Sequence, residues 1–205
     1  MENEEYLNQI STHVAPAQAP RKGLFSSKFF IVGLIGVVGF ILITILGAIL
    51  SGGGGDSAKD LSFALKLHLD ATTEAINTYQ PQVKSSILRS NSASLRSIIA
   101  NTNNGLTNYV TDKYAFKPKE VKAKLVDEAN MAKDALLQEL FDAKITGRLD
   151  RTYARKMAYE IDIITAEESR LINMAKDDIL KEMLTKSYDS LVALYDQFND
   201  FSEAK

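Results

Sequence analysis

The stretch FFIVGLIGVVGFILITILGAILSGGGGDS, residues 29–57, divides the chain into two parts of different character. Residues 29–50 carry no charge, and Thr44 is their only polar side chain. A helix of about 22 residues is about 33 Å long, enough to cross a hydrocarbon core of about 30 Å. The residues that follow are rich in Lys, Asp and Glu. The pattern predicts a transmembrane helix over 29–50 and a water-facing domain over 58–205.

Two other interpretations of the apolar run compete with a membrane helix. A buried helix of a soluble protein rarely stays apolar on every face for this length, and sixteen residues of the run are Phe, Ile, Leu or Val. A cleaved signal peptide usually has an apolar core of about 7–15 residues and a cleavage site of the Ala-x-Ala type. This run is longer, and that spacing is missing around Ala48. The membrane helix is favoured, with cleavage as the alternative.

The charges beside the run predict its orientation. Arg21, Lys22 and Lys28 precede it, whereas the first base after it is Lys59. Positive flanks stay in the cytoplasm, so residues 1–28 are expected to be a disordered cytoplasmic tail and the C-terminal domain extracytoplasmic. The glycine-rich residues 51–57 are expected to form a short, freely jointed tether.

Small residues of the predicted span fall near one helical face. Such a face lets two membrane helices approach closely, which would give a homo-oligomer. The alternative is that glycine is simply common in membrane helices. The candidate association face consists of Gly33, Gly36, Thr44, Gly47 and Ala48.

The composition of the 205-residue chain excludes several classes of function. Its net charge of −2 gives no basic field for nucleic acid, and the absence of cysteine removes disulfides and thiolate chemistry. No catalytic motif is found, so no catalytic, cofactor or metal residue is predicted. His68, alone in the domain, is interpreted as a boundary residue beside the core. The carboxylate pairs Glu167–Glu168 and Asp177–Asp178 are interpreted as solvated, because neighbours on a helix diverge.

From residue 57 onward the apolar positions follow a helical period. The pattern predicts helices over 57–79, 82–113 and 118–146, a fourth that Asp150 caps, and a short fifth over 188–201. Pro81 and Gly147 mark ends. Residues 101–105, NTNNG, indicate a kink or loop. The last 52-residue pattern should break near 185–187, with a capping box at 165–168 as the competing position.

Short connections predict an up-down antiparallel bundle of four to five helices. In such a bundle the turns near Pro81 and Gly147 share one end, and the turn near Pro118 lies at the other. The positions expected to face the core are Leu61, Leu65, Leu69, Ile76, Tyr79, Val83, Ile87, Leu95, Ile98, Leu106, Tyr109, Val121, Leu125, Leu136, Leu140, Ile145, Tyr188, Leu191, Leu194, Tyr195, Phe198 and Phe201. Packing of the last helix on the bundle is favoured over its lying on the membrane, because its other face is acidic.

One surface patch is a candidate site for an anionic partner. Basic residues gather around the turn near Gly147, and a positive tip suits an acidic protein surface or an anionic envelope polymer. The alternative is an ordinary solvated turn neutralised by Asp142 and Asp150. The patch consists of Lys144, Arg148, Arg151, Arg155 and Lys156.

The order of tail, span, glycine-rich tether and helices resembles that of uncharacterised single-pass surface proteins with helical ectodomains from reduced-genome candidate-phylum bacteria. The resemblance implies a membrane-anchored helical domain and no particular activity. The sequence therefore predicts a non-enzymatic, membrane-anchored envelope protein whose bundle serves protein–protein or cell-surface interaction. The alternative is an extracytoplasmic bundle that senses or binds a small solute in its interior.

Overall fold

The structure, a computed structural model, describes residues 57–114 and 123–201. Within these residues it is all-α, as predicted, with no strand. The elements are α3 Ser57–Tyr79, the 3-10 turn η2 Gln80–Gln82, α4 Ser86–Tyr114, α5 Ala123–Ile145, α6 Leu149–Met174 and α7 Asp178–Asn199. No helix in these ranges is both long and apolar enough to span a membrane. The predicted span at 29–50 and its candidate association face lie outside the described residues.

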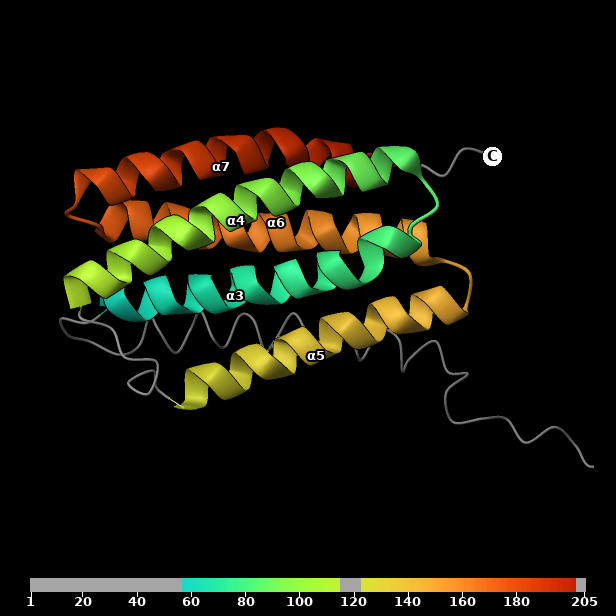
Figure 1. The fold of residues 1–205 in the computed structure, drawn as a ribbon, viewed down its shortest axis with the longest axis horizontal. Helices are drawn as coiled ribbons and strands as arrows, with labels where there is room; N and C mark the ends of the chain where they lie inside the picture. The colour runs from blue at the N-terminus through green and yellow to red at the C-terminus, as the bar shows by residue number, and fades with distance from the viewer. Residues whose placement is uncertain (1–56, 115–122, 202–205) are drawn as a thin grey trace, which may run out of the picture. The chain divides into compact units, whose positions relative to one another are not determined.

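The helices run alternately up and down along the bundle (Figure 1). Helices α3, α4, α7 and α6 form a closed ring, because α3 packs on α4 and α6, and α7 packs on the same two helices. Helix α5 lies outside this ring against α3 and α6. The turns after α3 and after α5 share one end of the bundle, which confirms the predicted connectivity. The described residues thus form a four-helix core with a fifth helix added on one side.

The core is made by the apolar stripes of the five helices. The predicted positions of α3 are all buried, from Leu61 to Tyr79, because their spacing keeps them on one face. The stripes meet in one continuous cluster. Its largest fully buried members are Tyr153, Phe198, Leu61, Leu65, Leu69, Ile76, Leu88, Leu95, Ile99, Leu106, Leu140 and Met157.

Asp150 joins two turns rather than capping its own helix. It was expected to cap the fourth helix, but that expectation is wrong: α6 begins at Leu149, and Asp150 lies in its first turn. Its two carboxylate oxygens accept hydrogen bonds from the backbone N–H groups of Lys84 and Ser85, at 2.9 and 2.7 Å. These donors precede α4, which begins at Ser86 rather than near residue 82.

Helix α5 ends at Ile145, and Gly147 closes its C-terminus, as expected. This residue has a φ of +70°, a conformation that glycine adopts at little cost. The Gly147 N–H donates to the carbonyl of Lys144, and the Arg148 N–H donates to the carbonyl of Ala143 at 2.8 Å. This pair of bonds is the Schellman arrangement that closes a helix C-terminus.

The long final pattern does break, but at neither expected position. Residues 165–168 lie within α6 and residues 185–187 within α7. The break falls at residues 175–177, where the Asp177 side chain accepts hydrogen bonds from the N–H groups of Ile179 and Leu180. An aspartate that caps a new helix competes with continuation of the old one. The stop is therefore encoded by a cap, without glycine or proline.

Two isoleucines expected in the core are exposed instead, Ile87 and Ile145, each at 65%. Counted from Leu95, Leu88 lies about 20° from the centre of the α4 stripe and Ile87 about 80° away, so Leu88 is buried. The same phase argument places Ala143 rather than Ile145 under α5. Both isoleucines therefore become surface residues near the end of the bundle that holds the two turns.

The NTNNG segment forms no loop, because α4 continues through it. The Thr102 hydroxyl donates to the carbonyl of Ile98, and the Thr107 hydroxyl donates to the carbonyl of Asn103. A Cβ atom added at Gly105 would lie 1.9 Å from the sulfur of Met183 on α7. The glycine thus leaves room for the flexible Met183 side chain against α4, a contact that the sequence alone does not show.

We expect the effect of Gly105→Ala on the free energy of unfolding to depend on whether position 183 holds methionine or alanine. In the Met183→Ala background, alanine should stabilise the protein by up to about 1 kcal/mol, because it is the better helix former. With Met183 present, overpacking costs about 1–3 kcal/mol and cancels or reverses that gain. Urea unfolding of the four variants of the cycle measures both effects. Equal effects in the two backgrounds would show that the close contact is unimportant.

Candidate functional site

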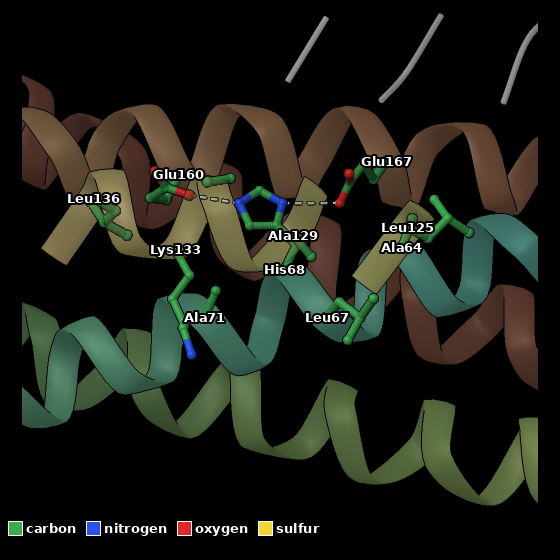
Figure 2. Close-up of a pocket in the computed structure, with 11 residues that line it drawn as sticks. Ala64, Leu67, His68, Ala71, Leu125, Ala129, Lys133, Leu136, Glu160 and Glu167 are labelled. Carbon is green, nitrogen blue, oxygen red and sulfur yellow. Dashed lines mark hydrogen bonds and ion pairs between the residues drawn. The ribbon is translucent and has the colours of Figure 1, made fainter. Parts of the chain in front are cut away.

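The most unusual feature of the interior is a histidine held between two glutamates, which we call the ionic layer (His68, Glu160 and Glu167). His68 extends from α3 toward α6, and the two glutamates lie on either side of its ring (Figure 2). Its Nε2 is 2.6 Å from Glu160 Oε2, and its Nδ1 is 3.1 Å from Glu167 Oε2. The three side chains are only 10, 7 and 5% exposed. Both ring nitrogens therefore face carboxylate acceptors in a site with little access to water.

This geometry keeps His68 charged. Burial alone lowers the pKa of His68, but the negative charges of Glu167 and Glu160 and the hydrogen bonds to both glutamates outweigh it and raise that pKa to about 10. An imidazolium has two N–H donors, one for each carboxylate. The prediction placed His68 at the boundary of the core but missed its buried ion pairs with the two glutamates.

Glu168 presents the opposite case, a buried carboxyl group that holds its proton. It is fully buried, and neither oxygen has a hydrogen bond of normal geometry among the described residues. Burial raises the pKa of Glu168 to about 8, although the nearby Ser187 hydroxyl lowers it in part. The Ser187 and Thr102 hydroxyl oxygens lie 2.7 Å apart, within hydrogen-bond distance. The prediction that Glu167 and Glu168 are solvated is wrong, since both are buried.

A small pocket adjoins the ionic layer between α3, α5 and α6 (Figure 2). Its volume is about 40 Å³, room for a few waters, whereas ligand pockets usually measure about 300–1,000 Å³. Alanines of α3 and α5 leave this space over the histidine. Its lining residues are Ala64, Leu67, His68, Ala71, Leu125, Ala129, Ala132, Lys133, Leu136, Glu160 and Glu167. Within 57–114 and 123–201, no three His, Asp or Glu residues are arranged to hold a metal ion.

The predicted basic patch is divided by the fold. Lys156 is buried and forms an ion pair with Glu139 on α5, and Arg155 contacts the same carboxylate at 3.3 Å. Lys144, Arg148 and Arg151 are exposed. Two members of the patch thus help to hold α5 against α6, and three remain available to a partner.

Beside these exposed bases lies an open hollow of about 680 Å³, which we call the tip hollow. It forms where the start of α4 meets the turn between α5 and α6, and Phe201 also lines it. Its lining residues are Gln82, Lys84, Ser85, Ser86, Ile87, Lys144, Gly147, Leu149, Asp150 and Phe201. Lys84 and Ile87 were not predicted as site residues, because they come from a turn far from Lys144 in sequence.

The ionic layer could have been suspected from the sequence. Glu160 and Glu167 occupy alternate positions, either side of Ile164, of the stripe Tyr153, Met157, Glu160, Ile164, Glu167 and Leu171, where apolar residues are expected. His68 likewise lies on the stripe of α3, between Leu65 and Thr72. One histidine and two carboxylates on facing apolar stripes are a pairing signal, because unpaired buried charges are costly.

The fold and these sites define the described part of the chain as an all-α, five-helix bundle with a buried ionic layer and an open, basic hollow at one end. No protein-family model, curated protein or solved structure matches the chain.

Proposed function

We propose that the protein is a non-enzymatic, single-pass membrane protein that displays its helical bundle outside the cytoplasm for protein–protein or cell-surface interaction. The observation that carries this proposal is the uncharged run at 29–50, which has bases close to its N-terminal side only. The first helix of the bundle, α3, starts at Ser57, directly after the glycine-rich tether. In this arrangement the end of the bundle with the tip hollow is the one farthest along α3 from the tether.

The chemistry of the interior supports binding rather than catalysis. His68 is the one histidine among the described residues, and both of its nitrogens are engaged by carboxylates. A general base must reach a substrate proton with a free nitrogen or oxygen. Glu168 is fully buried and has no access to solvent. The ionisable groups with the largest pKa shifts are therefore enclosed by the fold, whereas Lys84, Lys144 and Arg148 at the tip are exposed.

The small volume of the interior pocket argues against the alternative function, a bundle that binds a solute. The interior pocket beside His68 is about 40 Å³, far below the size that a solute requires. A solute could enter only if α5 moved away from α3 and α6. The interaction module is therefore the better-supported function.

We expect the full-length, uncleaved protein to stay with vesicles in alkaline carbonate. Carbonate removes proteins held by surface contacts, whereas the apolar run at 29–50 favours lipid by about 5–10 kcal/mol on translocon-derived residue scales. The matched control is the chain without residues 29–50, which should be released. Release of the intact full-length protein would overturn the membrane proposal.

The orientation can be tested with single cysteines, because the chain has none of its own. Ser97→Cys places a thiol at an exposed position of α4, and Ser11→Cys places one in the tail. A membrane-impermeant maleimide should label Ser97→Cys in intact cells and Ser11→Cys only after the membrane is opened. The reverse pattern would place the bundle in the cytoplasm.

A further inference from the structure

We propose that the tip hollow binds an acidic peptide segment of a partner protein, and that this segment contributes at least one large apolar side chain. The inference rests on the proposed function, in which the bundle is a binding module, and it adds the surface and the class of partner. Of the predicted patch only Lys144 lines the hollow, and the proposal adds Lys84 and Ile87.

The walls of the hollow are fixed by hydrogen bonds between segments far apart in sequence. Asp150 accepts the N–H groups of Lys84 and Ser85, which ties the start of α4 to α6. One guanidinium nitrogen of Arg89 donates to the carbonyls of Val83 and Lys84, at 2.8 and 2.7 Å. The Schellman turn at Gly147 fixes the opposite wall. A preformed surface of this kind loses little conformational entropy when it binds.

The charges that line the hollow favour an anionic ligand. Lys84 and Lys144 are exposed and form no ion pair within the described part of the chain. Asp150 is the one carboxylate in the lining, and both of its oxygens already accept backbone N–H groups. Arg148, also exposed, follows Gly147 in the same turn.

Other carboxylates near this end of the bundle limit where the ligand's acidic groups can lie. Asp142 lies two residues before Lys144 on α5 and accepts a hydrogen bond from Gln138. Asp196 and Asp200 are at the end of α7, next to Phe201. The positive side of the hollow is therefore the side made by α4, α5 and α6, and acidic ligand residues belong there.

The exposed apolar side chains favour a peptide over an anionic polymer. Ile87 lines the hollow and is 65% exposed, and the half-buried Phe201 faces it from the end of α7. Ile145 is equally exposed and lies two residues before Gly147 in the basic turn. Burial of apolar side chains by a partner is favourable, but a sugar or phosphate polymer offers few apolar groups. A peptide with both carboxylates and a Leu, Ile or Phe uses every part of this surface.

The test is selection of a random peptide library on the full-length protein in detergent micelles, followed by affinity measurement on single peptides. Enriched peptides should combine Asp or Glu with a large apolar residue. Lys84→Glu/Lys144→Glu should weaken their binding by at least about tenfold, because two attractive charges become repulsive. Ile87→Ser should also weaken it. The matched control, Lys176→Glu/Lys186→Glu, reverses exposed lysines away from the hollow and should have no effect.

Several results would overturn the inference. Enrichment of peptides without acidic residues, or equal loss of binding in the control variant, would exclude the hollow as an acidic-peptide site. Equal binding of polyglutamate, with no effect of Ile87→Ser, would indicate recognition of an anionic polymer. By contrast, tighter peptide binding after removal of residues 202–205 would support the inference, because these residues would then compete with the peptide for the hollow. If no acidic peptide binds the hollow but the full-length protein stays with vesicles in carbonate, the inference fails and the membrane proposal is unaffected.

Discussion

Replacement of His68 by leucine is expected to lower the free energy of unfolding by about 3–5 kcal/mol, the usual cost of removing one partner from a buried ion pair. The histidine is the shared positive partner of Glu160 and Glu167, at 2.6 and 3.1 Å. Its loss leaves two carboxylates in a site with little water to solvate them. Urea unfolding followed by circular dichroism measures the change.

Two further variants separate charge pairing from packing. His68→Leu/Glu160→Leu/Glu167→Leu should recover most of the lost stability, because an apolar replacement of a whole buried ionic group is often neutral or stabilising. Lys66→Ala removes the exposed Lys66–Asp70 pair of the same helix and should cost no more than about 1 kcal/mol. A similar loss for His68→Leu and for the triple variant would contradict the pairing argument, because it would trace the effect to shape alone.

The proton held by His68 also predicts a loss of stability in alkaline solution. The pKa of His68 is raised from 6.5 to about 10, so the folded state holds this proton more tightly than the unfolded state does. The stabilisation is fully present below pH 6.5 and is lost as the pH rises through 10. The His68→Leu variant should not show this part of the pH dependence.

Glu168→Gln is expected to become more stable than the wild type as the pH rises from 5 to 8. The pKa of Glu168 is raised from 4.5 to about 8, so between these values the folded state binds more protons than the unfolded state. The free energy of unfolding of the wild type therefore falls with rising pH, by at most about 1.4 kcal/mol per pH unit from this group. Glutamine does not titrate, so the variant should gain on the order of 3 kcal/mol relative to the wild type across this window.

The measurement is a set of urea unfolding curves at pH 5, 6, 7 and 8. His68 titrates in both proteins, so the difference between their profiles isolates Glu168. Glu182→Gln is the matched control: Glu182 is exposed on α7, and the charge and hydrogen bond of Lys186 lower its pKa below 4.5. This control should leave the profile unchanged. Parallel profiles for the wild type and Glu168→Gln would show that Glu168 is already ionised in the fold.

The ends of the helices were predictable where a residue acts through its own backbone. Tyr79 ends α3 just before Pro81, and Gly147 ends α5, because proline and glycine limit or permit particular φ angles whatever surrounds them. The stop between α6 and α7 was missed, because Asp177 is a cap only when the preceding residues leave the helix. Capping is a competition between conformations, and packing decides it.

The candidate sites were harder to predict than the fold. The bases of the α5–α6 turn are adjacent in sequence, but Lys156 is buried against Glu139, and Lys84 reaches the same hollow from another turn. His68, Glu160 and Glu167 were visible as polar residues on apolar stripes, without any indication that they meet. Which polar residues share a site depends on the order and rotation of the helices around the bundle.

By itself, the sequence determined the all-α class, the alternating direction of the helices and most of the α3 core, because these follow from a 3.6-residue period and short connections. It also provides the uncharged run on which the membrane proposal rests. Only the tertiary structure decided that α5 lies outside a ring of four helices, that Gly105 makes room for Met183, and that one histidine pairs with two glutamates. Local periodicity fixes which face of a helix is buried, whereas contacts between distant segments depend on how the faces are matched in space.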